Sequence, residues 1–360
     1  MPFTTTLTAA PRAETERAAI LADPGFGRHF TDHMAMAEWS ADRGWHDLCV
    51  RGLEPFSMHP GAGVLHYGQE IFEGLKAYRH ADGSIHLFRP DRNAARFARS
   101  AVRLAMPALP AALFIEAVEA LVRADAEWVP AHGGEDALYL RPIQFASESF
   151  LGVRPSASAT FCVVASPAGA YFRGGVAGIK LWVTTTYTRA AVGGTGDIKC
   201  GGNYAGSLLA QTEAQEQGCD QVLYTSGPAG RRVLDEAGTM NLMLITADGE
   251  LLTPRLGTIL EGVTRGSLLE LAQEHGLVAV EREITLAELL DGVRSGQVSE
   301  VFAAGTAAVI TPITALAGEG FDLIVGSGEP GANTTALREH LLGIQHGDAA
   351  DSRGWLRRIC

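Results

Sequence analysis

The sequence predicts a two-domain α/β (α+β) protein in which strands, helices and hairpins are mixed. The chain has 360 residues, which fits two domains at about 150 residues each. Hydrophobic residues make up 46% of it, which is enough for extensive cores and excludes disorder over most of the chain. Strand-like alternation and helical periodicity follow one another without the regular βαβ rhythm of a doubly wound sheet.

The N-terminal half begins with a segment of little periodicity, residues 1–25, which we expect to be a loosely ordered arm. The turn signal Asp82-Gly83 and the alternation over 83–90 predict a hairpin strand. Asp91 is expected to cap the helix that follows. Two helices and two strands are expected here, at 91–105, 110–128, 137–145 and 159–166.

A glycine-rich stretch at 171–178 divides the chain near its middle and is the best candidate for a linker. We therefore expect an N-terminal domain over 1–172, a linker over 173–187 and a larger C-terminal domain over 188–360. Asp248-Gly249 predicts another hairpin. The expected strands lie at 179–186, 220–225, 231–235 and 240–246, and the expected helices at 204–217, 263–275, 285–295 and 335–345.

Composition excludes several function classes. The net charge of −12 and the lack of a basic run argue against nucleic acid as the main partner, because phosphate binding needs a cationic surface. No apolar stretch reaches the roughly 18 residues that a membrane span requires. The five cysteines form no CxxC pair, which favours free thiols in a reducing cytoplasm. The histidines form no recognisable metal set, so no metal is expected.

The chain contains three lysines, Lys76, Lys180 and Lys199, and Lys199 lies in the glycine-rich loop 193–204. The loop does not match the phosphate-loop pattern, since Ile198 precedes the lysine and Cys200 follows it. It does not match the dinucleotide-binding pattern either, since Lys199 stands three residues after Gly196. A lysine among apolar neighbours can be a desolvated amine that forms a Schiff base. A turn with a solvated lysine is the simpler alternative, and spacing alone favours it.

Three further segments have two interpretations each. Asp235-Glu236 leads into a glycine turn. This segment is either an acidic β-turn or the source of a carboxylate that keeps a heterocyclic nitrogen protonated. Gly262-Val263-Thr264 opens a helix. The start of this helix either binds a phosphate or is simply capped by Thr264. The small residues 303–308 between apolar strands form an amide nest or a tightly packed turn.

In this order, these segments resemble the branched-chain amino-acid aminotransferases, which are fold-type IV pyridoxal-phosphate enzymes. The resemblance runs from about Gly27 to Gly347 and is carried by residues 30–34, 65–78, 87–90, 138–142, 198–204, 235–242, 262–265 and 305–307. It implies a two-domain fold-type IV aminotransferase that binds pyridoxal 5'-phosphate.

The resemblance also implies roles for single residues. Lys199 would be the catalytic, Schiff-base lysine, Glu236 would pair with the pyridinium nitrogen, and Tyr204 would bind the phenolic oxygen of the ring. The phosphate would be held by Arg89, Val263, Thr264 and Thr306. Lys76 lies in the motif Glu73-Gly-Leu-Lys-Ala77, where the family lysine is structural, and Lys180 lies in no motif.

The family reaction moves an amino group from leucine, isoleucine or valine to 2-oxoglutarate in two half-reactions, giving a branched 2-oxo acid and glutamate. An aromatic pocket of Tyr67, Phe72, Tyr139 and Tyr171 would hold the side chain. Thr306 and Ala307 would bind the α-carboxylate, and Arg141 with the Tyr67 hydroxyl would bind the second carboxylate of glutamate.

In the family, the loop corresponding to residues 151–153 completes the pocket of a second subunit, so the resemblance implies a homodimer, here in the cytoplasm. Ala308 and Thr311 stand where mammalian relatives carry a redox CxxC pair, so thiol regulation is not expected there. The alternatives are another fold-type IV enzyme, either a D-amino-acid aminotransferase or an aminodeoxychorismate lyase, and a non-catalytic binding protein with a glycine-rich pocket.

Overall fold

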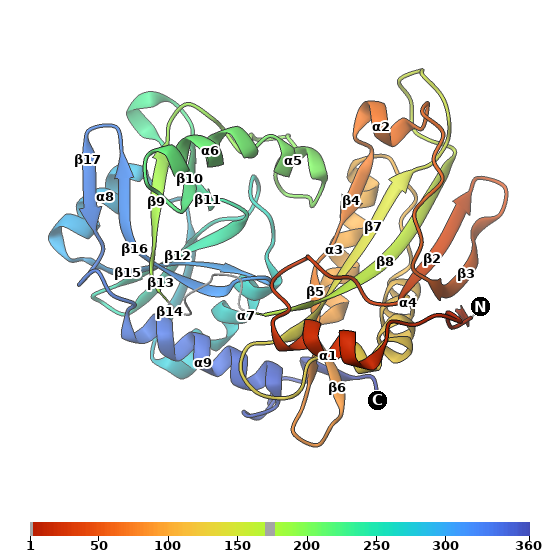
Figure 1. The fold of residues 1–360 in the computed structure, drawn as a ribbon. Coiled ribbons are helices and arrows are strands. Elements are labelled where there is room, and N and C mark those ends of the chain that lie inside the picture. Colours follow the sequence, from red (N-terminus) through yellow and green to blue (C-terminus); the bar gives the residue numbers. More distant parts are fainter. Residues whose placement is uncertain (1–2, 170–176) are drawn as a thin grey trace. The chain divides into compact units, whose positions relative to one another are not determined.

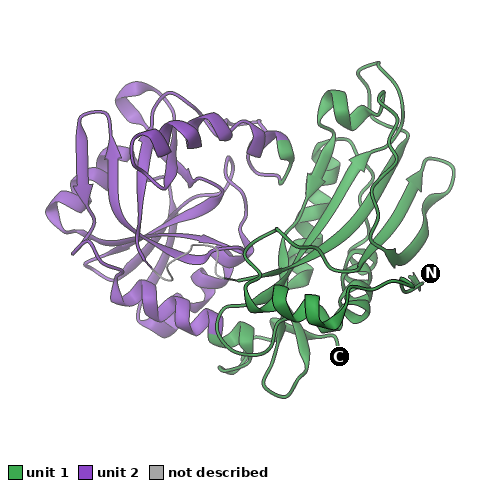
Figure 2. Ribbon diagram, in the orientation of Figure 1, with its two compact units in different colours: residues 1–171, 199–201, 343–360 green, residues 172–198, 202–342 purple. Residues whose placement is uncertain are grey.

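The computed structural model describes residues 3–169 and 177–360. The chain divides into two compact units, coloured separately in Figure 2. Unit 1 comprises residues 1–171, 199–201 and 343–360, and unit 2 comprises residues 172–198 and 202–342. The short segment Lys199–Gly201 therefore belongs with unit 1, although it lies far along the sequence. The domain boundaries expected from the sequence stay a prediction.

Unit 1 is built on a mainly antiparallel sheet, whose strands run in the order β1-β3-β2-β8-β7-β5-β6-β18, with β4 paired to β7. Its elements are β1 (Thr4–Thr5), α1 (Glu14–Ala22), β2 (His33–Ser40), β3 (Gly44–Gly52), α2 (Gly63–Tyr67), β4 (Glu70–Phe72), β5 (Leu75–Arg79), β6 (Ile85–Phe88), α3 (Pro90–Arg103), α4 (Ala111–Ala124), η1 (Ala126–Trp128), β7 (Ala137–Ala146), β8 (Ser158–Ala168) and β18 (Leu356–Arg358). Helices α3 and α4 pack against each other and against this sheet (Figure 1).

Helix α3 shows why this segment of unit 1 is helical. Ala94, Phe97 and Ala101 recur at three- and four-residue spacing and are buried, so one face of the helix joins the core. The expectation that Asp91 caps the helix is wrong. Helix α3 begins one residue earlier, at Pro90, whose missing N–H costs nothing in a first helical turn, and Asp91 lies inside that turn.

The N-terminal arm is more ordered than expected, because residues 1–25 include β1 and helix α1. Strand β1 pairs in parallel with β3, and the Thr6 amide donates to the Val50 carbonyl at 2.9 Å. Helix α1 buries a single residue, Ile20, so its sequence carries too little apolar periodicity to reveal a helix. Backbone pairing, rather than an apolar stripe, orders this arm.

Unit 2 contains a closed ring of strands, since β11 pairs with both β10 and β12 in the order β11-β10-β9-β16-β15-β12. The elements are β9 (Ile179–Thr184), α6 (Leu208–Glu216), β10 (Gln221–Ser226), η2 (Ala229–Arg231), β11 (Val233–Ala237), β12 (Met240–Thr246), β13 (Glu250–Pro254), α7 (Val263–Leu271), η3 (Ala272–His275), β14 (Val278–Arg282), α8 (Leu286–Ser295), β15 (Val298–Gly305), β16 (Val309–Gly318) and β17 (Phe321–Ile324). Two further helices, α5 (Gly201–Ala205) and α9 (Ala332–His346), include residues of both units.

The main core of unit 2 lies between these strands and helix α8. Leu181 of β9, Leu223 of β10, Leu242 of β12 and Leu316 of β16 are inaccessible to solvent and belong to one cluster, which Leu289 of α8 joins. The hairpins expected at Asp82-Gly83 and Asp248-Gly249 are confirmed, because β5 pairs with β6 and β12 with β13 in antiparallel register.

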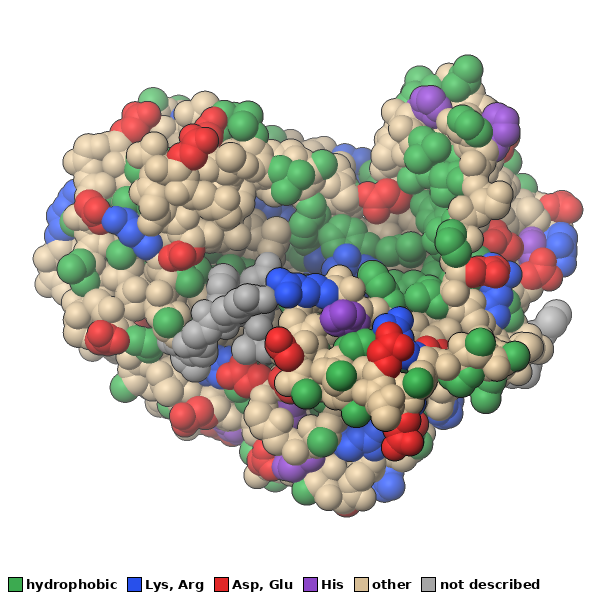
Figure 3. All heavy atoms as spheres, viewed as in Figure 1, with side chains coloured by type: hydrophobic (Ala, Val, Ile, Leu, Met, Phe, Trp, Pro, Cys, Tyr) green, Lys and Arg blue, Asp and Glu red, His purple; other side chains and the backbone are tan. Residues whose placement is uncertain are grey.

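On the face of the molecule drawn in Figure 3, acidic and basic side chains are interspersed on each unit rather than gathered by sign. Within residues 3–169 and 177–360, the structure contains no helix with both the length and the apolar character needed to cross a membrane.

Candidate active site

Lys199 is held in unit 1 through the backbone on both sides of it. The Phe72 amide donates to the Lys199 carbonyl at 3.0 Å, and the Lys199 amide donates to Ser100 Oγ at 3.1 Å. Two residues later, the Gly201 amide donates to the Glu70 carboxylate. Strand β4 and helix α3 therefore fix the position of the lysine, which explains why Lys199–Gly201 belongs with unit 1.

The Lys199 amine lies 4.7 Å from the centroid of the Phe72 ring. Burial lowers the pKa of this amine to about 8; the positive charge of Arg96 acts in the same direction, and the negative charge of Glu73 opposes it. A lysine with such a pKa is neutral, and hence nucleophilic, in a much larger fraction of molecules near neutral pH than an exposed lysine. The alternative of a solvated lysine does not fit this environment.

Glu73 and Arg96 form a buried, two-pronged ion pair beside the lysine. Arg96 Nε lies 2.7 Å from Glu73 Oε1, and Arg96 Nη2 donates to Glu73 Oε2 at 2.8 Å. Asn93 Nδ2 also donates to Glu73 Oε2, at 2.8 Å. Burial alone would raise the pKa of Glu73, but the Arg96 charge and these hydrogen bonds hold it below its ordinary value. Both partners of the pair are therefore charged.

Two of the expected substrate residues lie beside the lysine's aromatic neighbour. The Arg141 guanidinium lies 4.8 Å from the centroid of the Phe72 ring and 5.3 Å from that of Tyr139. Arg141 Nη2 donates to the Tyr139 hydroxyl at 3.1 Å. Arg141 and Tyr139 both act electrostatically on Lys199. Unit 1 thus brings together Lys199, Phe72, Tyr139 and Arg141.

Three other expected residues of the N-terminal part are placed differently. Tyr67 is exposed, and its hydroxyl donates to the Leu151 carbonyl. Arg89 is buried, its guanidinium lies 4.6 Å from the centroid of the Trp355 ring, and its amide donates to the Trp355 carbonyl at 2.8 Å. Tyr171 lies outside the described residues.

Glu236 is a buried carboxylate of unit 2, on strand β11. It lies 2.6 Å from Arg189 Nε and accepts hydrogen bonds from Asn241 Nδ2 at 2.9 Å and from the Leu260 amide at 3.2 Å. These donors stabilise the ionised form of the carboxylate. Glu236 is thus positioned by three separate parts of unit 2.

The neighbouring acid, Asp235, has a raised pKa. Burial raises the pKa of Asp235 to about 6, which hydrogen bonds from Ser226 and Thr258 and the Arg189 charge only partly offset. Ser226 Oγ donates to Asp235 Oδ1 at 3.1 Å. Asp235 therefore takes up a proton on mild acidification, near pH 6.

Helix α7 begins at Val263 with Gly262 as its N-cap, so the alternative interpretation, capping by Thr264, is wrong. A Cβ at Gly262 would lie 2.0 Å from Asn241 Oδ1, so glycine is required here because the chain passes close to the Asn241 amide. Gly262 makes no side-chain cap, which leaves the first-turn amides of α7 to bind another acceptor. Thr264 is buried within that turn.

The remaining expected residues lie in a short helix and a turn of unit 2. Tyr204 belongs to α5, and its carbonyl accepts a hydrogen bond from Ser207 Oγ at 2.7 Å. Thr306 and Ala307 are half-buried in the turn between β15 and β16. Unit 2 therefore carries Glu236, the α7 N-terminus, Tyr204 and this turn, and unit 1 carries the lysine.

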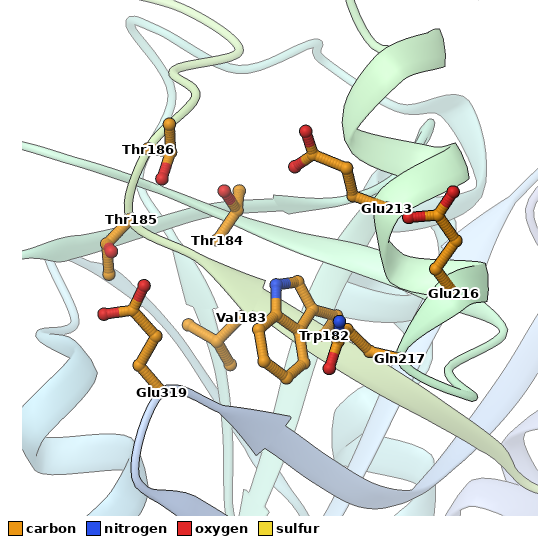
Figure 4. A pocket seen from close by; sticks show the side chains of 9 residues that line it. All are labelled: Trp182, Val183, Thr184, Thr185, Thr186, Glu213, Glu216, Gln217 and Glu319. Atoms are coloured by element: carbon orange, nitrogen blue, oxygen red, sulfur yellow. The ribbon is translucent and has the colours of Figure 1, made fainter.

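A pocket of about 180 Å³ opens elsewhere in unit 2 (Figure 4). Its lining comes from β9, the end of α6 and the turn after β16, namely Trp182, Val183, Thr184, Thr185, Thr186, Glu213, Glu216, Gln217 and Glu319. The expected site residues are not among these nine. The Tyr187 hydroxyl donates a hydrogen bond to Glu213 Oε1 at 2.6 Å. Nothing about this acidic pocket suits a phosphate or a carboxylate.

Residues 70–316 match the family described as amino-transferase class IV. The chain belongs to this family. It is 52% identical over 352 residues to a probable branched-chain-amino-acid aminotransferase of Streptomyces coelicolor, covering 98% of this chain and 97% of the relative. It is 49% identical over 363 residues to the branched-chain-amino-acid aminotransferase of Mycobacterium tuberculosis H37Rv, covering 100% and 98%.

Solved structures of class IV aminotransferases have the same fold. The branched-chain amino acid aminotransferase of Escherichia coli matches with a TM-score of 0.75 at 27% identity, covering 91% of this chain and 100% of the other. The branched-chain aminotransferase of Thermoproteus uzoniensis with norvaline matches with a TM-score of 0.73 at 26% identity, covering 91% and 100%. The expected fold class, α/β (α+β) of fold type IV, is confirmed, as is the family resemblance.

Sequence reasoning missed several residues that interact with the expected site residues. Arg189 and Arg96 lie outside the motifs of the family resemblance, and nothing in their local sequence distinguishes them from surface arginines. Trp355 is close to the C-terminus, beyond the segment that resembled the family. Asn241 was within a recognised motif, and its place directly opposite Glu236 on the β11–β12 hairpin could have suggested the contact.

Proposed function

We propose that this chain is a pyridoxal-phosphate-dependent branched-chain amino-acid transaminase. It would exchange the amino group between leucine, isoleucine or valine and 2-oxoglutarate in a ping-pong reaction that yields branched 2-oxo acids and glutamate. The observation that carries this proposal is the Lys199 amine, whose pKa burial lowers to about 8 beside the Glu73–Arg96 pair. The relatives at 52% and 49% identity support the substrate class.

The residues of both units fit pyridoxal 5'-phosphate by their chemistry. Lys199 supplies an amine for the aldehyde, and Glu236 supplies an ionised carboxylate for the ring nitrogen. The first-turn amides of α7 and the buried Arg89 suit a phosphate dianion. The residues that would hold the cofactor are Lys199, Arg89, Tyr204, Glu236, Val263, Thr264 and Thr306.

The bound cofactor supplies an electron-withdrawing ring that stabilises the charge left on the substrate when its α-proton is removed. Glu236 would accept a hydrogen bond from the ring nitrogen and so keep that nitrogen protonated. Its own ionised form is stabilised by Arg189, Asn241 and the Leu260 amide. Tyr204 would donate to the phenolic oxygen of the ring.

Lys199 would move the proton of the substrate. Once a substrate amine has displaced Lys199, its Nζ is a free base that can remove the α-proton of the substrate and return the proton at another atom. A pKa of about 8 suits both steps, because such an amine accepts and releases a proton near neutral pH. The backbone contacts of Lys199 with Phe72 and Ser100 would keep it in register for the transfer.

The substrate pocket would bind either a branched aliphatic side chain or the side-chain carboxylate of glutamate. Phe72, Tyr139, Tyr67 and Tyr171 would surround the branched side chain. Arg141 would bind the second carboxylate of glutamate, and its position over the Phe72 and Tyr139 rings supports that role. The amides of Thr306 and Ala307 would bind the α-carboxylate.

We also infer that the chain has the expected two domains and works as a cytoplasmic homodimer, in which the second subunit completes the pocket. The five cysteines are free thiols, which supports a reducing compartment. The exposed Leu151 and Val153, in the loop that would reach the second subunit, support the dimer.

Initial-rate kinetics test the proposed reaction. With L-leucine and 2-oxoglutarate varied together, glutamate formation should give parallel double-reciprocal lines, as a ping-pong reaction requires. Intersecting lines would contradict the two-step transfer. A chain that forms no glutamate and binds no pyridoxal phosphate would instead be a binding protein.

A further inference from the structure

The Glu73–Arg96 pair is almost completely enclosed within unit 1. The Glu73 side chain is inaccessible to solvent, and that of Arg96 is 4% exposed. Besides Arg96 and Asn93, the Gly74 amide donates to Glu73 Oε2 at 3.1 Å, and the Glu73 amide donates to the Pro142 carbonyl at 2.8 Å. The carboxylate is thus fixed from α3 and from its own turn.

The charged and titratable groups that act on Lys199 come from three elements of unit 1. Arg96 belongs to α3, Glu73 to the turn between β4 and β5, and Arg141 and Tyr139 to β7. Glu70 of β4 binds the Gly201 amide rather than the amine. Arg96 and Glu73 act with opposite sign on the amine, and they are fixed to one another.

We propose that Glu73 and Arg96 are positioning residues whose opposite charges together set whether the Lys199 amine carries a proton. This inference rests on the proposed function of Lys199 and extends it. The intact pair presents both signs of charge to the amine, so Glu73 offsets part of the influence of Arg96. Helix α3 carries Arg96 itself. It also carries Asn93, which binds Glu73, and Ser100, which binds the Lys199 amide.

The balance makes a prediction that a purely structural ion pair does not. Replacing Glu73 leaves the Arg96 guanidinium uncompensated, which disfavours a proton on Lys199. Replacing Arg96 leaves the Glu73 carboxylate uncompensated, which favours that proton. The two single substitutions should therefore shift the protonation of one amine in opposite directions, although both break the same contact.

Competitive acetylation measures this protonation directly, because only a neutral amine reacts. The full-length chain, without added cofactor, is treated with acetic anhydride at a series of pH values, and each lysine is quantified by mass spectrometry. Lys76 and Lys180 serve as internal references in the same sample. Relative to the unsubstituted chain, the reaction midpoint of Lys199 should fall by about one pH unit or more in Glu73→Gln and rise by about as much in Arg96→Met.

Two further variants guard against misfolding and nonspecific effects. Arg96→Lys keeps the positive charge and should restore a midpoint close to that of the unsubstituted chain. Glu119→Gln makes the same chemical change in another buried glutamate of unit 1, which pairs with Arg123 and Arg357, and should leave the midpoint unchanged. If Arg96→Met fails to fold by circular dichroism, the direction of the shift in Glu73→Gln decides.

Shifts of the same sign in Glu73→Gln and Arg96→Met, or shifts no larger than that of Glu119→Gln, would overturn the inference. A rise in Glu73→Gln alone would do so as well. Because labelling needs neither cofactor nor substrate, the result stands apart from the proposed function. A chain with the opposed shifts but no transamination would disprove the function and leave the pair's role intact.

Discussion

The Arg189 guanidinium lies 2.6 Å from the Glu236 carboxylate, and both side chains are almost entirely buried. Arg189 Nη1 also donates to the Gly196 carbonyl at 3.0 Å, within the glycine-rich loop that leads to Lys199. One guanidinium therefore links the carboxylate expected to bind the cofactor nitrogen to the loop before the cofactor lysine. This link explains how a substitution at one residue can affect both.

Arg189→Met should weaken both folding and cofactor binding, because it leaves Glu236 as a buried carboxylate without its guanidinium partner. We expect the free energy of unfolding to fall by roughly 3–5 kcal/mol, the usual cost of breaking a buried ion pair. Affinity for pyridoxal phosphate should drop by about tenfold or more, which corresponds to about 1.4 kcal/mol. Chemical denaturation and cofactor titration measure the two effects.

Arg255→Met is the matched control, because Arg255 pairs with Glu283 at 3.5 Å while remaining 69% exposed. Its free energy of unfolding should change by less than about 0.5 kcal/mol. Unaltered cofactor affinity in Arg189→Met would show that Glu236 does not depend on the guanidinium.

Gly196→Ala should disrupt the glycine-rich loop, since the new Cβ would lie 2.1 Å from the Thr258 carbonyl oxygen and 2.2 Å from Ala190 Cβ. Neither atom belongs to a flexible side chain, so the backbone must shift, at a cost of roughly 1–3 kcal/mol. Thermal denaturation should show a lower Tm, and cofactor affinity should fall with it. Gly202→Ala has open space at its Cβ and should leave the Tm unchanged or slightly higher. Equal effects of the two substitutions would argue against the tight loop.

The rate of covalent pyridoxal phosphate capture should rise with pH. Burial lowers the pKa of Lys199 to about 8, so the reactive neutral amine becomes the major form above that pH rather than above the usual lysine value. Stopped-flow measurement of the visible absorbance of the holoenzyme should give a sigmoidal increase centred near pH 8, which levels off at higher pH. A rate that still increases steeply at about pH 10, the ordinary lysine range, would mean that the amine is solvated.

An amino-donor panel with 2-oxoglutarate should rank the branched L-amino acids above all other donors. L-leucine, L-isoleucine and L-valine should each yield glutamate, since we expect Phe72 and Tyr139 to line the pocket for the branched side chain and Arg141, which lies over both rings, to bind the second carboxylate of glutamate. D-alanine is the matched negative control. Turnover restricted to D-alanine would assign the chain to the D-amino-acid aminotransferases instead.

Much of the fold could be predicted from local sequence. The strand expected at 240–246 is β12 residue for residue, and the helix expected at 285–295 is α8 within one residue, because apolar periodicity and turn glycines mark both. The order of the arm over 1–25 could not be predicted from local sequence, since it comes from pairing with β3. The helix expected at 204–217 is divided into α5 and α6, with a break at Gly206-Ser207.

The site divides in the same way. Lys199 and Glu236 were recognisable because they lie in compact motifs, and their roles stay predictions. Arg96, which pairs with Glu73, and Arg189, which pairs with Glu236, could not be found from spacing, because both contacts form between elements distant in sequence. A buried arginine and a surface arginine look alike in a single sequence. Tertiary packing alone decides which one tunes a titratable group.

The central claim is that Lys199 is the residue through which this class IV aminotransferase acts. Borohydride reduction of the holoenzyme fixes bound pyridoxal phosphate covalently to its lysine, and peptide mapping then has only three lysines to distinguish. We expect a single modified peptide, the one that contains Lys199. Modification of Lys76 or Lys180, or a holoenzyme of Lys199→Ala that still fixes the cofactor, would contradict it.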